Sequence, residues 1–107
     1  MYSRIVECRV RPDKRDEFAR RLENDVMPIL KKQAGFVDTI GMIGETDAHH
    51  IVAISFWQRK EDAERYAQQH FSEVLQLIRP LIDGDPKVET FQVAAPANSR
   101  ILSTLAA

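Results

Sequence analysis

Residues 50–58, HIVAISFWQ, form the most apolar run of this 107-residue chain. Alternate residues of a β-strand point to opposite faces of its sheet. In a strand of this sequence, one face carries Val52, Ile54 and Phe56, and the other carries Ile51, Ala53 and Trp57. Because both faces are apolar, we expect the run to be a central strand of its sheet.

The patterns on either side of this run alternate between strands and helices. Strands are predicted from period-two alternation and apolar runs at 3–11, 36–44, 50–58 and 87–95. Helices are predicted from apolar residues at helical spacing at 13–34 and 60–83. Asp13 is the expected N-cap of the first helix, Pro28 is expected to kink it, and His70 marks a bend or break in the second. Gly84-Asp85-Pro86 is predicted to be a turn.

The resulting order β-α-β-β-α-β is the ferredoxin-like plan. It is an α+β fold with one antiparallel sheet and both helices on one face of that sheet. In this interpretation residues 1–96 form a single domain. Residues 97–107 form a C-terminal tail that docks on the domain or on a partner.

Composition excludes several classes of partner. Lys and Arg total 15 against 16 Asp and Glu, so the chain has no basic surface suited to nucleic acid or to an anionic membrane. No stretch approaches the roughly 20 apolar residues that span a bilayer, and the first residues lack a signal-peptide pattern. The single cysteine, Cys8, cannot form a disulfide within the chain, which favours a cytoplasmic protein.

The second face of the sheet predicts a homodimer. Two helices cover one face only, and an apolar face left in water would cost several kcal/mol at about 25 cal/mol per Å². We therefore expect two copies to pack sheet against sheet. The residues expected at this dimer interface are Ile5, Glu7, Arg9 and Trp57, whereas Val6, Cys8 and Val10 are expected under the helices. Glu7 and Arg9 are expected to pair with each other or across the dimer.

Five short segments also carry a resemblance to a known family. They are VECRVRP (6–12), MPIL (27–30), QAGF (33–36), FWQRKEDA (56–63) followed by Tyr66, and QHF (69–71). In this order and spacing, over residues 3–95, the chain resembles the antibiotic biosynthesis monooxygenase (ABM) domains. The resemblance implies a dimeric α+β barrel with a pocket between sheet and helices in each protomer. Family members include quinol monooxygenases, polyketide-tailoring oxygenases that need neither metal nor flavin, haem-degrading enzymes and enzymes that degrade a quorum-sensing molecule.

The resemblance implies a cofactor-independent monooxygenase that oxidises a small aromatic or quinol-type molecule with O2. That chemistry deprotonates a phenolic substrate in a dry pocket, and the resulting carbanion reduces O2. His70 is the candidate catalytic base, because histidine titrates near neutrality. Tyr66, one helical turn earlier, is the candidate to bind a substrate oxygen. Cys8, Phe56 and Phe91 are the expected pocket walls.

Haem chemistry is not expected. Haem-degrading members carry an Asn on the first strand and a Trp and a His on the second helix. The matching positions here are Cys8, Tyr66 and Leu75. Adjacent His49 and His50 would point to opposite faces of a strand, so we expect no metal site there.

Structural roles compete with each functional assignment. His70 also fits a histidine at a helix end, Tyr66 and Trp57 fit core packing, and Cys8 fits a small buried hydrophobe. Two other functions also remain open. One is a non-catalytic homodimeric module that binds a small apolar or aromatic ligand, and the other is a dimerisation unit with a filled core. A closed cavity of about 300 Å³ or more beside His70, with polar groups converging on it, would favour the enzyme or the binder over the filled core.

Overall fold

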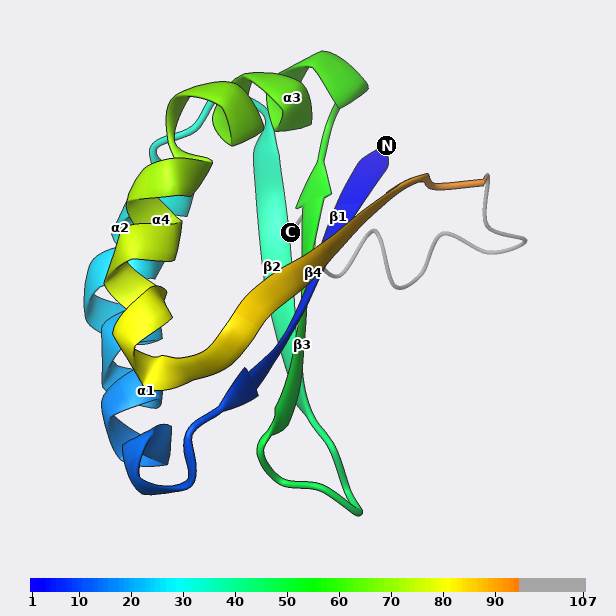
Figure 1. Ribbon diagram of the computed structural model, residues 1–107. Coiled ribbons are helices and arrows are strands. Elements are labelled where there is room, and N and C mark those ends of the chain that lie inside the picture. Colours follow the sequence, from blue (N-terminus) through cyan, green and yellow to red (C-terminus); the bar gives the residue numbers. More distant parts are fainter. Residues whose placement is uncertain (95–107) are drawn as a thin grey trace.

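The computed structural model describes residues 1–94 (Figure 1), so the expected tail at 97–107 lies outside the described residues. The elements are β1 (Tyr2–Val10), α1 (Arg15–Arg21), α2 (Met27–Lys31), β2 (Phe36–Ile43), β3 (His50–Trp57), α3 (Lys60–Gln69), α4 (Phe71–Ile78) and β4 (Ile82–Gln92). Short helical turns occupy Pro12–Lys14, Leu22–Val26 and Arg79–Leu81.

The four strands form one antiparallel sheet in the order β2-β3-β1-β4. Helices α1, α2 and α4 cover one face of this sheet, and α3 lies across one end (Figure 1). The architecture is the ferredoxin-like α+β fold, as the sequence predicts. The apolar run is the internal strand β3, between β2 and β1. One of its faces lies under the helices, and the other belongs to the uncovered face of the sheet.

The first helical segment is interrupted where the sequence predicts a kink. Pro28 has no N–H to donate to the carbonyl of Asn24, and its ring would crowd that carbonyl. The chain accommodates Pro28 with a π-helical turn, in which the Met27 N–H bonds to the Leu22 carbonyl five residues back. The expected N-cap at Asp13 is wrong, because Asp13 lies in a 3-10 turn and the helix start has no side-chain cap.

The second helical segment breaks at His70, as expected. The His70 backbone leaves the helical region (φ −132°), so α3 ends there and α4 begins. Beyond α4, β4 starts at Ile82, five residues earlier than predicted. The predicted turn at 84–86 is instead a bulge within β4, because Glu7 pairs with Lys87 while Arg9 pairs with Asp83. A bulge accepts Pro86, which has no N–H for the ladder, and Gly84 takes a positive φ of 70° there.

The pairing register assigns the residues of β1 to the two faces. Val6 pairs with Ala53 and Cys8 with Ile51, and these residues face the helices. Ile5, Glu7 and Arg9 alternate with them and lie on the open face, as expected from the sequence. The apolar residues of the open face are Ile5, Ile40, Met42, Val52, Ile54, Phe56 and Phe91.

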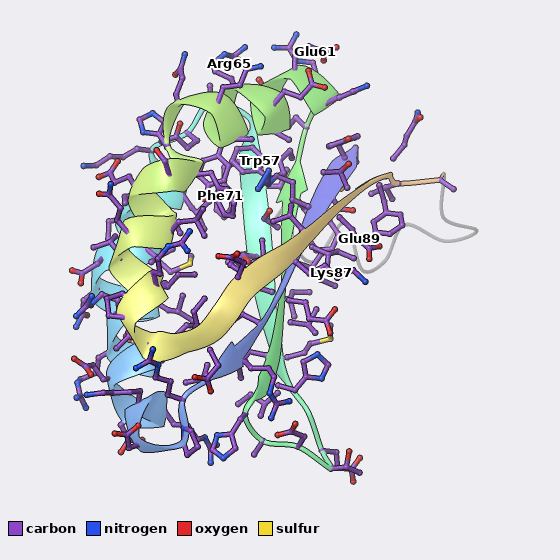
Figure 2. All side chains as sticks on the ribbon, in the orientation of Figure 1. Trp57, Glu61, Arg65, Phe71, Lys87 and Glu89 are labelled. Atoms are coloured by element: carbon purple, nitrogen blue, oxygen red, sulfur yellow. The ribbon has the colours of Figure 1, made fainter. Side chains whose placement is uncertain are left out.

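Trp57 corrects one prediction about this open face. It has the same parity as Ile51 and Ala53, so its indole points to the helices and not to a partner sheet. The side chain is 0% exposed. It stacks on Tyr66 at 5.1 Å and meets Phe36 edge-on at 5.5 Å, measured between ring centroids. Trp57 is therefore a core residue, and Figure 2 shows it on the side of the sheet opposite Lys87 and Glu89.

Candidate functional site

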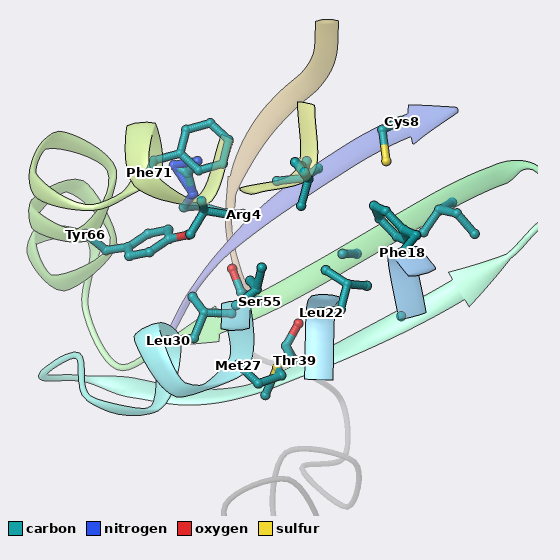
Figure 3. A pocket seen from close by; sticks show the side chains of 17 residues that line it. Arg4, Cys8, Phe18, Leu22, Met27, Leu30, Thr39, Ser55, Tyr66 and Phe71 are labelled. Carbon is teal, nitrogen blue, oxygen red and sulfur yellow. The ribbon is translucent and has the colours of Figure 1, made fainter. Parts of the chain in front are cut away.

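A cavity of about 200 Å³ lies between the sheet and the helices (Figure 3). Its floor is formed by helix-facing residues of β1, β2 and β3, including Val6 and Ala53. Its roof comes from both helical segments, residues 15–31 and 60–78, which lie on the same side of the sheet. The apolar residues of the roof are Phe18, Leu22, Val26, Met27, Leu30, Phe71, Val74 and Ile78. Such walls repel water and favour an apolar ligand.

The open volume at the floor depends on a glycine. Gly41 lies on the helix-facing side of β2, and a Cβ built on it would meet no atom within 4 Å. A larger residue there would therefore extend into empty space. A second hollow of about 280 Å³ adjoins the first and shares Phe18, Leu22, Gly41 and Ile51 with it. Gly41 thus borders both spaces, and a side chain at this position would narrow them.

Arg4 is the charged residue at one end of the cavity. Its side chain lies among aromatic rings, with Cζ 4.6 Å from the Phe71 ring centroid and 5.5 Å from that of Tyr66. Figure 3 shows these three residues together, with Cys8 at the far end. Arg4 is only 5% exposed, and burial lowers the pKa of its guanidinium. It forms no hydrogen bond or ion pair with any of residues 1–94.

Tyr66 supplies a hydroxyl beside Arg4. The residue is 4% exposed, and its ring is held between Trp57 and Phe71. Burial raises the pKa of Tyr66 to about 12, against the opposing effect of the Arg4 charge. The hydroxyl therefore keeps its proton at neutral pH. It can donate a hydrogen bond to a ligand oxygen, as the sequence suggests, but it cannot act as a base.

Two further hydroxyls face the same space. Thr39 donates to the Ile54 carbonyl at 2.9 Å, so its proton is already used. Ser55 Oγ accepts the Trp57 indole N–H at 2.9 Å and keeps its own proton to donate. Cys8 also lines the cavity as predicted, and burial, followed by the nearby Glu7 charge, raises the pKa of its thiol. The thiol stays protonated and serves as a small apolar wall.

The structure does not bring His70 to the cavity. The residue sits at the junction of α3 and α4, with its side chain 36% exposed, and Nδ1 lies 3.7 Å from Glu73 Oε2. It is absent from the cavity lining. The cavity of about 200 Å³ is smaller than the roughly 300 Å³ taken as the criterion for a ligand site, and it does not lie beside His70. The helix break turns position 70 outward, away from the face that carries Tyr66.

Phe56 and Phe91 also lie away from the cavity that they were expected to line. Phe56 pairs with Ser3, which in turn pairs with Phe91, so all three share the open face. Phe91 is 46% exposed there. The physical reason is the strand period of two: Ser55 and Trp57 face the helices, which forces Phe56 to the other side.

Within the chain, two charged residues of β1, Glu7 and Arg9, contact side chains of β3 and of the hairpin loop. Glu7 Oε1 lies 2.6 Å from His50 Nε2, and Arg9 forms an ion pair with Asp47 of the hairpin loop. Glu7 and Arg9 therefore do not pair with each other. No cluster of three or more metal-ligating side chains occurs within residues 1–94.

Arg4 is the site residue that sequence reasoning missed. The sequence does contain a signal for Arg4. In a strand, Arg4 points to the same face as Val6, Cys8 and Val10, all of which are predicted to face the helices. A charged residue on the covered face of a strand is costly unless it has a partner or a function. That exception in the alternation identifies the polar end of the cavity.

The fold and the cavity define a ferredoxin-like α+β protein with a small internal binding space. The sequence profile of the antibiotic biosynthesis monooxygenase family matches residues 1–82, and the chain belongs to this family. None of the curated proteins compared with the chain matches it. Within residues 1–94, no helix combines the length and the hydropathy needed to cross a membrane.

Solved structures share the fold at low sequence identity. SnoaB, a cofactor-independent oxygenase from Streptomyces nogalater, is similar with a TM-score of 0.76 and 18% identity, covering 90% of this chain and 95% of that one. A conserved protein from Methanosarcina mazei has a TM-score of 0.72 and 18% identity, and the match covers 86% of this chain and 92% of that one. Rv0793 from Mycobacterium tuberculosis has a TM-score of 0.72 and 13% identity, and the match covers 91% of this chain and 98% of that one. These likenesses concern the fold.

Proposed function

We propose that this chain is a cofactor-independent monooxygenase that oxidises a small aromatic, quinol-type molecule with O2. The observation that carries the proposal is the apolar cavity with its hydroxyl and guanidinium donors gathered at one end. Membership of the family and the fold shared with SnoaB support the reaction class. The single cysteine, kept as a thiol in the core, is consistent with work in a reducing cytoplasm.

The size of the cavity favours a substrate with one ring. A dry apolar cavity of about 150 Å³ is enough to hold one benzene molecule. The space of about 200 Å³ therefore suits a single ring with one or two small substituents. A filled dimerisation core, one of the three functions left open by the sequence, would leave no such space.

The proposed reaction converts a hydroquinone and O2 into a hydroxyquinone and water. The substrate anion passes one electron to O2, and the resulting superoxide and ring radical combine to form the new C–O bond. Loss of water from the resulting hydroperoxide then breaks the O–O bond. One oxygen atom stays on the ring, the other leaves as water, and the substrate supplies all four electrons.

In this proposal the residues of the cavity stabilise the substrate anion. The Tyr66 hydroxyl donates a hydrogen bond to its oxygen, and the Arg4 charge lies at the same end of the cavity. The effect of such donors is large where water is excluded, because little solvent screens them. The apolar walls also protect the radical pair from water.

A non-catalytic ligand-binding module is the second candidate. The titratable groups among the lining residues are Arg4, Cys8 and Tyr66. Arginine stays protonated in proteins, and the raised pKa values of Cys8 and Tyr66 keep their protons in place at neutral pH. A binding module needs no proton acceptor in its lining. An enzyme with this lining must bind its substrate already deprotonated. O2 uptake distinguishes the two candidates.

The test measures O2 uptake by the purified chain with a panel of one-ring quinols, with a chelator present and no flavin added. We expect turnover that falls at least about tenfold in a Gly41→Leu variant, because the new side chain occupies the cavity. Ile40→Leu is the matched control, since Ile40 is the adjacent residue on the open face. Quinol binding without O2 uptake would instead establish the binding module.

We also propose that two copies pair through their open faces. Ile40, Met42 and Phe91 are 36%, 44% and 46% exposed on that face, and a patch of this kind on a single domain marks an interface. Two of the charged groups beside it already have partners, because Glu7 contacts His50 and Lys87 forms an ion pair with Glu89. A second copy can therefore cover the apolar residues without leaving these charges unpartnered.

A further inference from the structure

Among residues 1–94, the guanidinium of Arg4 is a buried cation that has no anionic partner. Most buried charges in proteins are paired, because removing a charge from water is costly unless a counter-charge replaces the lost hydration. Within residues 1–94, Asp62 is the buried carboxylate, and it is bonded to Arg59 and Arg65. Among these residues, the Arg4 guanidinium lies against the rings of Tyr66 and Phe71, which attract a cation but do not neutralise it.

The rings also fix the position of the guanidinium. With Phe71 on one side and Tyr66 near by, the Arg4 head group is held at the cavity wall, and its N–H donors have no acceptor among residues 1–94. The Tyr66 hydroxyl also has no hydrogen-bond partner among these residues. A fixed set of unsatisfied donors beside an apolar space is a preorganised site for one oxygen anion.

We infer that the cavity selects one-ring aromatic ligands that carry an anionic oxygen, a carboxylate or a phenolate, and binds that oxygen at Arg4. The inference rests on the proposed function and names its substrate class. The ring occupies the apolar part of the cavity toward Cys8, and the oxygen takes hydrogen bonds from Arg4 and Tyr66. The lining groups include no proton acceptor, and this agrees with an anionic ligand, because such a ligand needs no base in the protein.

The test compares two ligands of the same shape and different charge. Benzoate is an anion at neutral pH, and benzamide is its neutral counterpart. Trp57 is the single tryptophan of the chain and stacks on Tyr66 at the polar end, so its fluorescence reports ligand binding. Alkylation of Cys8, the single cysteine, gives a second readout from the far end of the cavity.

We expect benzoate to bind about tenfold to a hundredfold more tightly than benzamide, as for a hydrogen bond to a charged group. Arg4→Met keeps a long side chain for the rings and removes the charge, so the preference should fall to within about twofold. Arg4→Lys keeps the charge and should retain part of the preference. Gly41→Leu should abolish binding of both ligands.

The phenolate form of the ligand has its own test. 4-Nitrophenol is yellow when ionised, so its absorbance reports the charge of the bound molecule. Binding to the wild-type protein should shift its ionisation to lower pH, and binding to Arg4→Met should not. A shift with 4-nitrophenol but no preference for benzoate would assign the site to phenolates alone.

Equal binding of benzoate and benzamide, with no shift for 4-nitrophenol, would overturn the inference from the wild-type protein alone, even if the Arg4 variants fail to fold. Absence of binding by all three ligands would also overturn it. The proposed function fails separately. Loss of the anion preference with continued O2 uptake removes only this inference, whereas anion-selective binding without O2 uptake removes only the monooxygenase.

Discussion

Gly35, which follows α2, packs directly against Asp62 in the first turn of α3. Gly35 has a φ of +81°, a conformation that L-residues with a Cβ rarely adopt. A Cβ at Gly35 would also lie 2.6 Å from the Cβ of Asp62. Asp62 is held in place by Arg59 and Arg65 and is 3% exposed. Both backbone conformation and space therefore require glycine.

A Gly35→Ala substitution should lower the free energy of unfolding by roughly 3 kcal/mol, the sum of left-handed strain and overpacking against Asp62. Gly84→Ala is the matched control, because Gly84 has a φ of +70° but open space around it. The control should cost only about 1 kcal/mol. Urea unfolding of both variants measures the difference, and equal costs would show that Asp62 does not constrain position 35.

Asp62 should make the stability depend on acid pH. The hydrogen bond from Arg59, followed by that from Arg65, holds the pKa of the Asp62 carboxyl below its ordinary value of 3.8. Its contribution is therefore complete above that value and is lost as the pH falls through the lower pKa of the folded state. Urea midpoints measured from neutral to acid pH should fall less steeply in Asp62→Asn than in the wild type.

The exposed Asp13 supplies the control for this comparison. Asp13→Asn changes the same chemical group at a position with no ion pair or side-chain hydrogen bond to any of residues 1–94, and it should leave the acid dependence of the wild type intact. Parallel acid curves for the wild type and Asp62→Asn would contradict the account.

Single residues differ in how well the sequence predicts them. Cys8 and Tyr66 line the cavity, and strand alternation and helical spacing determine the faces on which they lie. Arg4 was missed, because a charged residue is ordinarily assigned to the wet face. His70 was misplaced because its direction depends on the backbone angles at the helix break, which no spacing rule provides.

At the level of helices and strands, the predicted kinks were more accurate than the predicted ends. Pro28 and His70 mark real interruptions of the two helical segments. At Pro28 the cause, the missing N–H of proline, is visible in the sequence. The start of β4 was placed five residues late. Gly84-Asp85-Pro86 is typical of a turn, and only pairing with β1 reveals a bulge within a strand.

His70→Ala should leave the function of the protein unchanged. Its side chain lies at the α3–α4 junction and does not line the cavity. We expect kcat/KM for O2 uptake, or ligand affinity, to stay within about twofold of the wild type, and stability to change by about 0.5 kcal/mol or less. A tenfold loss of turnover with normal ligand binding would return His70 to the mechanism.

For the molecule as a whole, the open face predicts association in solution. Sedimentation of the wild-type chain at micromolar concentration should give a dimer. Phe56→Glu should weaken the dimer by about 3 kcal/mol or more, because it places an unpaired carboxylate in the proposed interface. Gln68→Glu, which adds the same charge at an exposed position of α3, should leave the dimer intact. A wild-type chain that sediments as a monomer would contradict the proposal.

The strand β3 has one further consequence. Ile51, Ala53 and Ser55 form part of the cavity floor, while Val52, Ile54 and Phe56 lie on the opposite side of the same backbone. The ligand chamber and the surface proposed to meet a second copy are thus separated by one layer of peptide. If filling the chamber strengthens that association, then association must strengthen filling by the same factor, since thermodynamic linkage is reciprocal.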